Sequence, residues 1–488
     1  MVDFSGMPHA VGYFAAARFD ADIRDCEVAG RVPPDLTGAF YRLHADWLYP
    51  PKFRDDASLA ADGYISVFRF RGGGLVDYRG HYVRTDRYAR QLAARRQLYG
   101  YYRNPFTDDP EVRNLDDPGE RTTANTTPVI LAGKLYATKE DGLPYRIDPN
   151  TLQTLGREQF GGAWHSQTFT AHPKLDPATG ELVAFGYEAS GIASREVFLA
   201  TFDAAGRLGH SMRFEVPHTT MLHDIAITDR HVVIPGSSAV TSVERLREGR
   251  IHWGWDHTKE SYYGIVPRSG DTGAIRWFRG PERSIVHTAN AWSEGHTVHV
   301  DLPMADGNTW PFFPDVHGAP FHMPPNTIRR MTFDLDSASE RAEERVLFAQ
   351  QTTSFTRIDD RWLGRAHRYI FVQFADLSRP FHATLPDDPR AQPVNSIARF
   401  DVRTGQMRTY FAGEAHVVQE PCFVPRSARS PEGDGYLLAT VHNLAAMRAE
   451  LAIVDAASMA ETARVILPFR NASQVHGAWA GERDLPLA

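Results

Sequence analysis

The sequence predicts an all-β protein built as a seven-bladed β-propeller, with long loops that cap one face. Short segments rich in Val, Ile, Tyr, Phe and Thr recur along the chain and are bounded by Gly, Pro or Asp, which is typical of β-strands. Helical periodicity is scarce, and strands do not alternate with helices as they do in a parallel sheet. Many hairpins of one kind over nearly 490 residues favour a large propeller of divergent blades.

The clearest strands occur in order along the whole chain. They are expected within residues 63–85, 134–140, 181–189, 196–206, 231–236, 296–303, 367–374, 436–443 and 450–459. The nearest approach to a helix is residues 86–102, "DRYARQLAARRQLYGYY", which is equally compatible with a strand followed by a helical turn.

A turn that opens on aspartate separates many of these strands. It reads "DPNTLQ" from Asp148, "DPATGEL" from Asp176, "DAAGRL" from Asp203, and "DVRTGQMRTY" from Asp401, with related turns near 269 and 455. An aspartate side chain accepts hydrogen bonds from the backbone two residues on, and a glycine takes a positive φ. The sequence therefore predicts adjacent antiparallel strands joined by tight turns.

Seven blades of about 70 residues would account for the length. No shift in composition marks a second domain, so we expect a single domain over 1–488, with the propeller starting and closing at about 25–488. Loops rich in Pro, Gly, Asp and aromatic residues are expected to cover one face. They span residues 103–125, 240–262, 303–327 and 376–395.

Composition restricts the classes of partner. The formal net charge is −7 and basic residues are scattered, which disfavours nucleic acid as a partner. Neither a signal peptide nor a run of 18 apolar residues is visible, so we expect a cytoplasmic protein without a membrane span. Two cysteines, Cys26 and Cys422, are too few for a disulfide framework or a thiolate metal site, so buried free thiols are expected.

Four of the 21 histidines fit a metal site on the propeller axis. His172, His223, His287 and His476 stand singly near expected strand starts, separated by about one blade or several. Imidazole suits Fe, Zn or Cu, and four ligands leave two positions of an octahedral ion open for O₂ or substrate. Taken one at a time, each is more often an ordinary histidine, so spacing alone leaves the site a weak hypothesis.

The contexts of these histidines resemble the carotenoid cleavage oxygenase family, and within it the bacterial lignostilbene dioxygenases. The resemblance spans nearly the whole chain, from "GRVPPDLTGAFYRLH" through "YRNPFTDDPEV", "TFTAHPKLDPATGEL" and "QEPCFVPR" to "VHGAW". It implies a seven-bladed propeller with non-haem Fe(II) held on its axis by His172, His223, His287 and His476. The nearby His165 is then expected to be structural or to support a ligand from outside.

The resemblance also implies glutamates that hydrogen-bond three of the ligand histidines. Two match here, Glu140 in "TKEDG" and Glu420 in "QEPCFVPR". The third family position reads "SFTRID", which places Ser354 where a glutamate is expected. A serine hydroxyl is shorter and neutral, so we expect it to reach its histidine only through water or not at all.

On the substrate side the family places a tyrosine and a lysine on a phenolic hydroxyl. The matching residues are Tyr102 and Lys139, which would stabilise the phenolate and so activate the conjugated alkene. The family's aromatic residue before the "GDG" segment corresponds to Leu59, which loses a ring contact. The pocket wall is expected to comprise Leu59, Tyr101, Phe312 and Phe313.

The expected activity is therefore cleavage of the central C=C bond of 4-hydroxystilbenes with O₂ into two aromatic aldehydes, with a homodimer as an option. One alternative is an apocarotenoid-cleaving oxygenase, which would need an apolar surface patch and no lysine–tyrosine pair. Another is an inactive propeller that serves as a binding module, favoured only by Ser354. A propeller lactonase would hold Ca²⁺ with oxygen ligands, whereas this sequence offers imidazoles.

Overall fold

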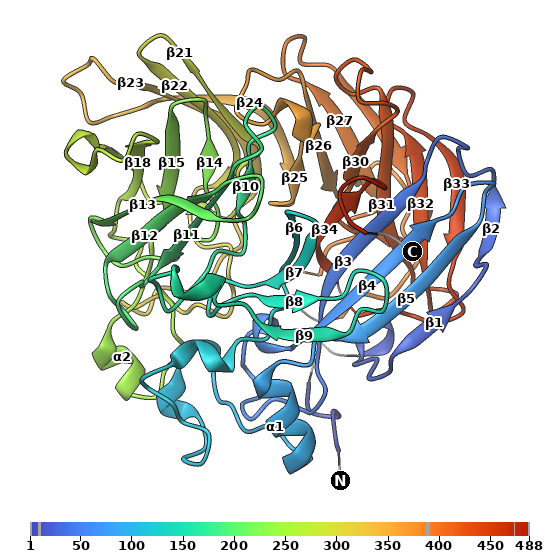
Figure 1. The fold of residues 1–488 in the computed structure, drawn as a ribbon, viewed down its shortest axis with the longest axis horizontal. Helices are drawn as coiled ribbons and strands as arrows, with labels where there is room; N and C mark the ends of the chain where they lie inside the picture. Colours follow the sequence, from blue (N-terminus) through green and yellow to red (C-terminus); the bar gives the residue numbers. More distant parts are fainter. Residues whose placement is uncertain (1, 8–10, 387–390, 473, 487–488) are drawn as a thin grey trace.

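The fold was analysed in a computed structural model, which describes residues 2–7, 11–386, 391–472 and 474–486. Seven antiparallel sheets surround a common axis, so the chain forms an all-β, seven-bladed β-propeller as predicted (Figure 1). A further pair of short strands lies outside the blades, namely β16 (Ala239–Val240) and β17 (Gly254–Trp255).

The first three blades contain the strands from the first half of the chain. The first has the order β1 (Ala21–Ile23), β5 (Val76–Tyr82), β4 (Asp62–Phe70), β3 (Gly38–Asp46) and β34 (Gln474–Ala480). The second comprises β6 (Thr127–Leu131), β7 (Lys134–Thr138), β8 (Tyr145–Ile147) and β9 (Thr154–Arg157). The third comprises β10 (Lys174–Leu175), β11 (Leu182–Tyr187), β12 (Glu196–Phe202) and β13 (Leu208–Glu215).

The other four blades complete the circle. The fourth comprises β14 (Ala226–Ile227), β15 (His231–Gly236), β18 (Ser261–Pro267) and β19 (Arg276–Gly280). The fifth comprises β20 (Ser284–Ile285), β21 (Asn290–Glu294), β22 (Thr297–Ala305), β23 (Asn326–Asp334) and β24 (Glu343–Thr352). The sixth comprises β25 (Thr356–Arg357), β26 (Tyr369–Phe374), β27 (Ser396–Asp401) and β28 (Met407–Phe411). The seventh comprises β2 (Glu27–Gly30), β33 (Ala460–Ile466), β32 (Arg448–Asp455), β31 (Gly435–Asn443), β29 (His416–Val418) and β30 (Cys422–Pro425).

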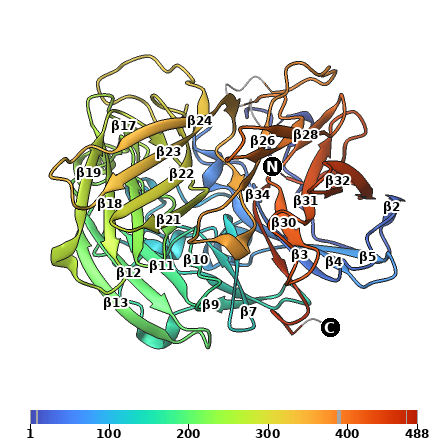
Figure 2. The same ribbon diagram turned by 90° about the horizontal axis from the view of Figure 1, so that it is seen from above.

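Two pairings join the ends of the chain. Strand β34 pairs with β3 in the first blade, and β2 pairs with β33 in the seventh. Figure 2 shows the N-terminal strands β3, β4 and β5 beside the C-terminal strands β30, β31 and β34. Because each pairing brings a strand from one end of the chain into a blade formed by the other end, the circle is closed twice.

The aspartate turns form as expected. The Asp148 carboxylate accepts hydrogen bonds from the backbone of Asn150 and Thr151, and equivalent bonds form at Asp176, Asp203, Asp271, Asp401 and Asp455. These bonds occupy backbone donors that the neighbouring strands cannot pair, so each turn ends one strand and starts the next.

Helix is confined to short segments. The segment at 86–102 contains α1 (Asp86–Ala94), capped by the Thr85 hydroxyl and ended by Arg95 in the left-handed region. Helix α2 (Val243–Arg247) is shorter, and single 3₁₀ turns occur at Gly12–Phe14, Ser58–Ala60, Pro105–Thr107, Pro118–Arg121, Phe160–Gly162, Thr272–Ala274 and Asp360–Trp362. Across the described ranges, no helix is long and apolar enough to cross a membrane. Cys26 and Cys422 are buried free thiols, as predicted.

Candidate metal centre and substrate site

The four histidines named from the sequence lie together on the axis. His172 precedes β10, His223 precedes β14, His287 lies between β20 and β21, and His476 lies in β34. All four are buried, and one nitrogen of each lies within 4.8 Å of a nitrogen of every other. Since they come from four different blades, packing of the blades assembles the cluster rather than any local motif.

The ring nitrogens that face the centre suit a metal ion. The Nε2 atoms of His172 and His223 are 3.1 Å apart, and the buried Nε2 atoms of His287 and His476 have no hydrogen-bond partner among the described residues. Two nitrogens that bind one ion at about 2.1 Å and at right angles would also lie about 3 Å apart. Burial and neighbouring histidines hold the pKa of His172 and of His287 well below the ordinary value, so both are neutral and can donate a lone pair.

Two glutamates orient two of these histidines through the Nδ1 atoms of their rings. Glu140 accepts a short hydrogen bond from Nδ1 of His223, and Glu420 accepts one of 2.9 Å from Nδ1 of His476. Burial alone would raise the pKa of Glu140, but His223 and Arg103 outweigh it and hold the pKa at about 2. Each carboxylate is therefore ionised and directs the Nε2 lone pair of its histidine to the centre.

Ser354 behaves differently from the sequence-based expectation. Nδ1 of His287 lies 3.0 Å from the backbone carbonyl oxygen of Ser354 and 3.2 Å from its hydroxyl. The expectation of a water-mediated or missing contact was therefore wrong, because both the hydroxyl and the backbone carbonyl of Ser354 lie within hydrogen-bonding distance of Nδ1. A carbonyl fixes the ring as a glutamate would, but it adds no negative charge.

Tyr102 and Lys139 lie together beside Glu140. The Tyr102 hydroxyl donates a short hydrogen bond to Glu140, and Nζ of Lys139 lies 5.2 Å from the centre of the Tyr102 ring. Both side chains are buried. Burial lowers the pKa of Lys139, with Asp141 and Glu140 opposing it, whereas burial and then Glu140 raise the pKa of Tyr102 well above its ordinary value. The carboxylate that orients His223 therefore also holds Tyr102.

Lys139 is held by partners that the sequence did not reveal. Its ammonium donates to Oδ1 of Asn125 at 2.8 Å and makes a short contact with the carbonyl of Leu59. Nδ2 of Asn125 donates to the same Leu59 carbonyl at 3.1 Å. An ammonium has three donors, so these two acceptors leave one N–H for a ligand. The sequence signal was slight, since Asn125 is one polar residue among several in "TTANTTPV".

The side chains expected to form the pocket wall share one apolar cluster. Tyr102 and Phe313 are buried in it, and Leu59, Tyr101 and Phe312 pack against it. Tyr101 stacks on Phe53 at 4.1 Å, and its hydroxyl donates to Asp55 in a more exposed position. The structure thus places the four residues in or against the same apolar cluster as Tyr102, with Tyr101 turned toward Phe53.

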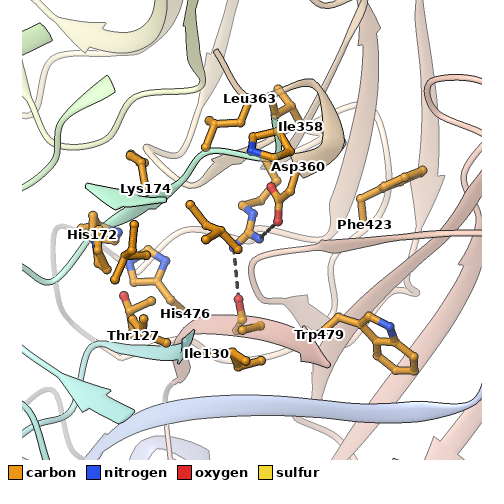
Figure 3. Close-up of a pocket in the computed structure, with 18 of the residues that line it drawn as sticks. Thr127, Ile130, His172, Lys174, Ile358, Asp360, Leu363, Phe423, His476 and Trp479 are labelled. Carbon is orange, nitrogen blue, oxygen red and sulfur yellow. Dashed lines mark hydrogen bonds and ion pairs between the residues drawn. The ribbon is translucent and has the colours of Figure 1, made fainter. Parts of the chain in front are cut away.

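A cavity of about 610 Å³ meets the centre from another direction. Figure 3 shows His172 and His476 toward one side of it and Phe423 and Trp479 toward the opposite side. The described residues that line it include neither Tyr102 nor Lys139. Its lining comes mainly from β6, β10, β25, β30 and β34 and the residues next to them, whereas Tyr102 lies between α1 and β6 and Lys139 directly follows β7.

His165 lies away from the cluster. Its side chain is exposed, and its ring lies 6.3 Å from that of Phe198. In the structure, therefore, His172 belongs to the cluster and His165 does not.

The family match extends over almost the whole chain. Residues 14–481 match the model of the family described as retinal pigment epithelial membrane protein. The chain belongs to the carotenoid cleavage oxygenase family.

Relatives of this chain include proteins named for stilbenes. Lignostilbene-alpha,beta-dioxygenase isozyme III of Sphingomonas paucimobilis is 38% identical, with 100% of this chain and 99% of that protein aligned. Resveratrol cleavage oxygenase 1 of Aspergillus fumigatus is 37% identical, with 99% and 97% aligned. The crystal structure of the Pseudomonas brassicacearum lignostilbene dioxygenase superposes with a TM-score of 0.94 at 37% identity, covering 99% of this chain and 100% of that one.

Proposed function

We propose that this oxygenase is a non-haem Fe(II) dioxygenase that cleaves the central C=C bond of 4-hydroxystilbenes with O₂ into two aromatic aldehydes. The observation that carries the proposal is the contact of Tyr102 with Glu140, which also holds His223, while Lys139 lies over the Tyr102 ring. A site for a phenolic oxygen therefore adjoins the candidate metal centre.

We assign the metal to His172, His223, His287 and His476, with Glu140, Glu420 and Ser354 behind three of them. Four neutral imidazoles suit iron and leave a divalent ion its full charge. Iron bound there would supply activation of O₂. The two unpartnered Nε2 atoms of His287 and His476 support this assignment, because buried ring nitrogens are rarely left without a partner.

Lys139 and Tyr102 would prepare the substrate. The remaining N–H of the Lys139 ammonium can donate to the substrate's phenolic oxygen, and its positive charge lowers the pKa of that phenol. The phenolate then raises the electron density of the conjugated alkene. Tyr102 and the apolar side chains of Leu59, Phe312 and Phe313 would hold the ring in place. Burial excludes water from these contacts and so strengthens them.

The functional test also distinguishes two alternative functions. An apocarotenoid-cleaving oxygenase would have no use for a buried lysine and tyrosine at this position. An inactive binding module would not need four histidines with glutamates behind them. The names of the relatives support the stilbene reading over both.

We also propose that residues 1–488 form one domain and that the protein acts in the cytoplasm, with a homodimer as an option. The two closing strand pairs support one domain, and the two free buried thiols fit a reducing compartment. Size-exclusion chromatography coupled to light scattering tests whether the protein is a homodimer.

The test of function is anaerobic reconstitution with Fe(II), followed by O₂ uptake and product analysis on 4-hydroxystilbene and 4-methoxystilbene. We expect two aldehydes from the hydroxy compound only. Iron binding without cleavage of either compound would overturn the stilbene assignment and direct the assay to apocarotenoids. Failure to bind iron would favour the inactive module.

A further inference from the structure

Three charged or titratable side chains form a buried cluster beside the proposed phenol site. We call Arg103, Glu188 and His252 the Arg103 cluster. Arg103 makes a short ion pair with Glu188, and Nε2 of His252 lies 2.9 Å from the other carboxylate oxygen of Glu188. Nδ1 of His252 lies 3.0 Å from the backbone carbonyl oxygen of Arg103. All three are nearly inaccessible to solvent.

The cluster touches the substrate-side residues through the backbone. Nη1 of Arg103 donates to the carbonyl oxygen of Glu140 at 3.1 Å and to the Tyr187 hydroxyl at 2.6 Å. Arg103 also follows Tyr102 directly in the chain, and Glu140 follows Lys139. One guanidinium therefore connects the segment that carries Tyr102 to the segment that carries Lys139 and Glu140.

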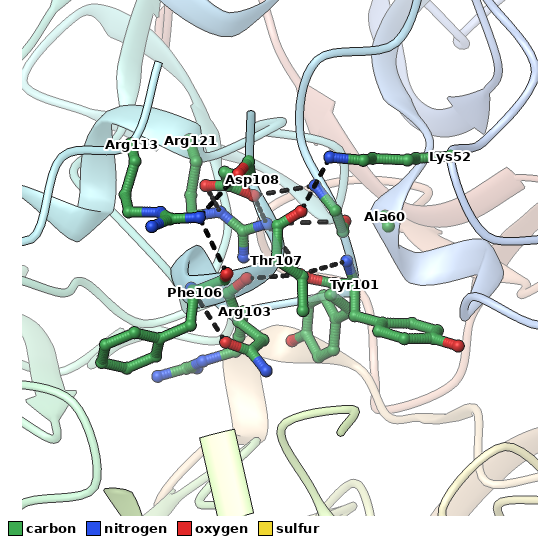
Figure 4. Close-up of polar contacts among 12 residues, drawn as sticks. Lys52, Ala60, Tyr101, Arg103, Phe106, Thr107, Asp108, Arg113 and Arg121 are labelled. Carbon is green, nitrogen blue, oxygen red and sulfur yellow. Dashed lines mark hydrogen bonds and ion pairs between the residues drawn. The ribbon is translucent and has the colours of Figure 1, made fainter. Parts of the chain in front are cut away.

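The three residues come from different parts of the fold. Arg103 lies in the loop after α1, Glu188 follows β11, and His252 lies between α2 and β17. The loop after α1 has its own polar contacts, which include a 2.8 Å bond between Arg121 and Asp108 (Figure 4). Asn104, the next residue, donates to the carbonyls of Leu246 and Arg250 in the segment that carries His252. The cluster thus joins loops of different blades.

Both partners of the ion pair have a strained backbone. Arg103 has a φ of 56° and Glu188 a φ of 53°, in the left-handed region that is unfavourable for residues other than glycine. A buried ion pair in addition must overcome the desolvation of both charges. Strain of this kind persists where the surrounding structure enforces it, and it gathers at functional sites.

We infer that Arg103, Glu188 and His252 are positioning residues, which hold Tyr102 and Lys139 at the spacing that a phenolic oxygen requires. The inference rests on the proposed function. The Arg103 side chain contacts the segment of Lys139 and Glu140, and its backbone adjoins Tyr102. Glu188 holds the Arg103 guanidinium in place, and His252 holds Glu188. Without the Glu188 charge, the guanidinium would be drawn toward the buried carboxylates that remain nearby, Glu140 and Asp141, and its hold on the Tyr102 and Lys139 segments would change.

The test is Glu188→Gln, which keeps the shape of the side chain and removes its charge. Dissociation constants of 4-hydroxystilbene and of unsubstituted stilbene are measured by fluorescence on the full Fe(II)-loaded chain under anaerobic conditions. We expect the dissociation constant of 4-hydroxystilbene to rise by about tenfold or more, because hydrogen bonds to charged groups are lost. The dissociation constant of unsubstituted stilbene should change by less than about twofold. His252→Gln, which leaves the ion pair in place, should shift the first constant in the same direction by a smaller factor.

A second buried triad, with an aspartate in place of the glutamate, provides the matched control. In the fifth blade, Asp301 accepts from Arg330 at 2.7 Å, and Nε2 of His367 lies 3.4 Å from Asp301. These side chains contact Trp292 and Asn290. Asp301→Asn should lower the melting temperature and leave both dissociation constants within about twofold of the wild type.

The outcomes separate this inference from the proposed function. Equal weakening of both ligands, or an unchanged constant for 4-hydroxystilbene in Glu188→Gln and His252→Gln, would overturn the positioning role. The same hydroxyl-dependent loss in Asp301→Asn would overturn it too. If Glu188→Gln does not fold, His252→Gln decides. A wild-type protein that neither prefers nor cleaves 4-hydroxystilbene overturns the proposed function itself, and the inference with it.

Discussion

At the scale of single residues, Glu140 is the group on which both halves of the site depend. One carboxylate oxygen accepts from Tyr102 and the other from Nδ1 of His223, while its backbone carbonyl accepts from Arg103. A carboxylate shared in this way ties the position of the phenol-binding tyrosine to the orientation of a metal-binding ring. Its neighbour Lys139 is constrained by Asn125 and Leu59 in turn.

The first residue-scale prediction concerns Lys139. Lys139→Met should lower kcat/KM for 4-hydroxystilbene by about 100-fold or more, because the charge that favours the phenolate is lost. Lys52→Met is the control, since Lys52 is exposed, unlike Lys139, and pairs with Asp109. It should change kcat/KM by less than about threefold. Equal losses in both variants would contradict the role of Lys139.

The second residue-scale prediction concerns the residues that accept hydrogen bonds from the metal-site histidines. Ser354→Ala should leave iron affinity within about threefold of the wild type, because the backbone carbonyl of Ser354 still accepts from His287. Glu420→Gln should weaken iron binding by about 10- to 100-fold, since it removes the charged partner of His476. Competition with a metal chelator measures both. A large loss in Ser354→Ala would show that its hydroxyl is the essential acceptor.

At the scale of strands, closure of the first blade depends on a close approach of β3 and β34. Gly38 pairs into this sheet with a φ of 141°, and a Cβ built on it would lie 2.4 Å from the carbonyl oxygen of Ala480. The backbone of Ala480 cannot move away without disturbing the pairing of Ala39 with Ala480. A glycine is therefore required where the two ends of the chain meet.

Gly38→Ala should accordingly destabilise the protein by about 1–3 kcal/mol, measured as a lower melting temperature. Gly209→Ala in β13 is the control, because a Cβ there meets its nearest neighbours at ordinary distances of 3.4 and 3.6 Å. That change should be neutral or slightly stabilising. Similar melting temperatures for the two variants would contradict the importance of the closing pair.

A buried histidine in β31 makes stability depend on pH. His442 is fully buried, stacks on Tyr13 at 4.6 Å, and has no hydrogen-bond partner for either ring nitrogen among the described residues. Burial, with Arg42 nearby, lowers the pKa of His442 to about 3 from 6.5. Between these values the unfolded chain takes up a proton and the folded chain does not, so stability falls as the pH drops from 6.5 toward 3.

His442→Phe should remove this contribution. Urea unfolding at pH 7 and pH 5 should show a smaller loss of stability on acidification than in the wild type, by about 2 kcal/mol. At pH 7 the variant should be about as stable as the wild type, since the ring contact with Tyr13 is kept and no buried hydrogen bond is lost. Identical pH dependence in both proteins would contradict the burial of a neutral imidazole.

At the scale of the whole molecule, the candidate metal centre connects blades that are distant in sequence. His172 and His476 are separated by 304 positions, yet their rings are 4.4 Å apart. A ligand that binds the folded chain and not the unfolded one stabilises it in proportion to the logarithm of its concentration. Metal binding at this point should therefore stabilise the propeller as a unit.

Anaerobic addition of Fe(II) at about 100 times its dissociation constant should stabilise the fold by about 2.7 kcal/mol, seen as a higher melting temperature that a chelator reverses. His476→Ala should abolish the increase. His165→Ala should keep it, because His165 lies outside the cluster. An increase of the same size in His476→Ala would mean that iron stabilises the protein from another site.

Much of the fold and part of the site were predictable because their causes are local or are carried by motifs. Aspartate turns such as that at Asp148 form from their own side chains, and short runs of β-branched and aromatic residues form strands wherever they can pair. The four histidines followed from the resemblance of their contexts, and the structure brings all four together.

The sequence by itself thus determined the strands, the turns that separate them and which histidines gather. Only the tertiary structure decided the rest. Examples are the backbone carbonyl of Ser354 that reaches His287, the sharing of Glu140 between Tyr102 and His223, and the Arg103 cluster. It also left Tyr102 and Lys139 out of the lining of the 610 Å³ cavity. The physical reason is that these contacts join loops from different blades, so their distances depend on how the blades pack and not on any pattern within a single segment.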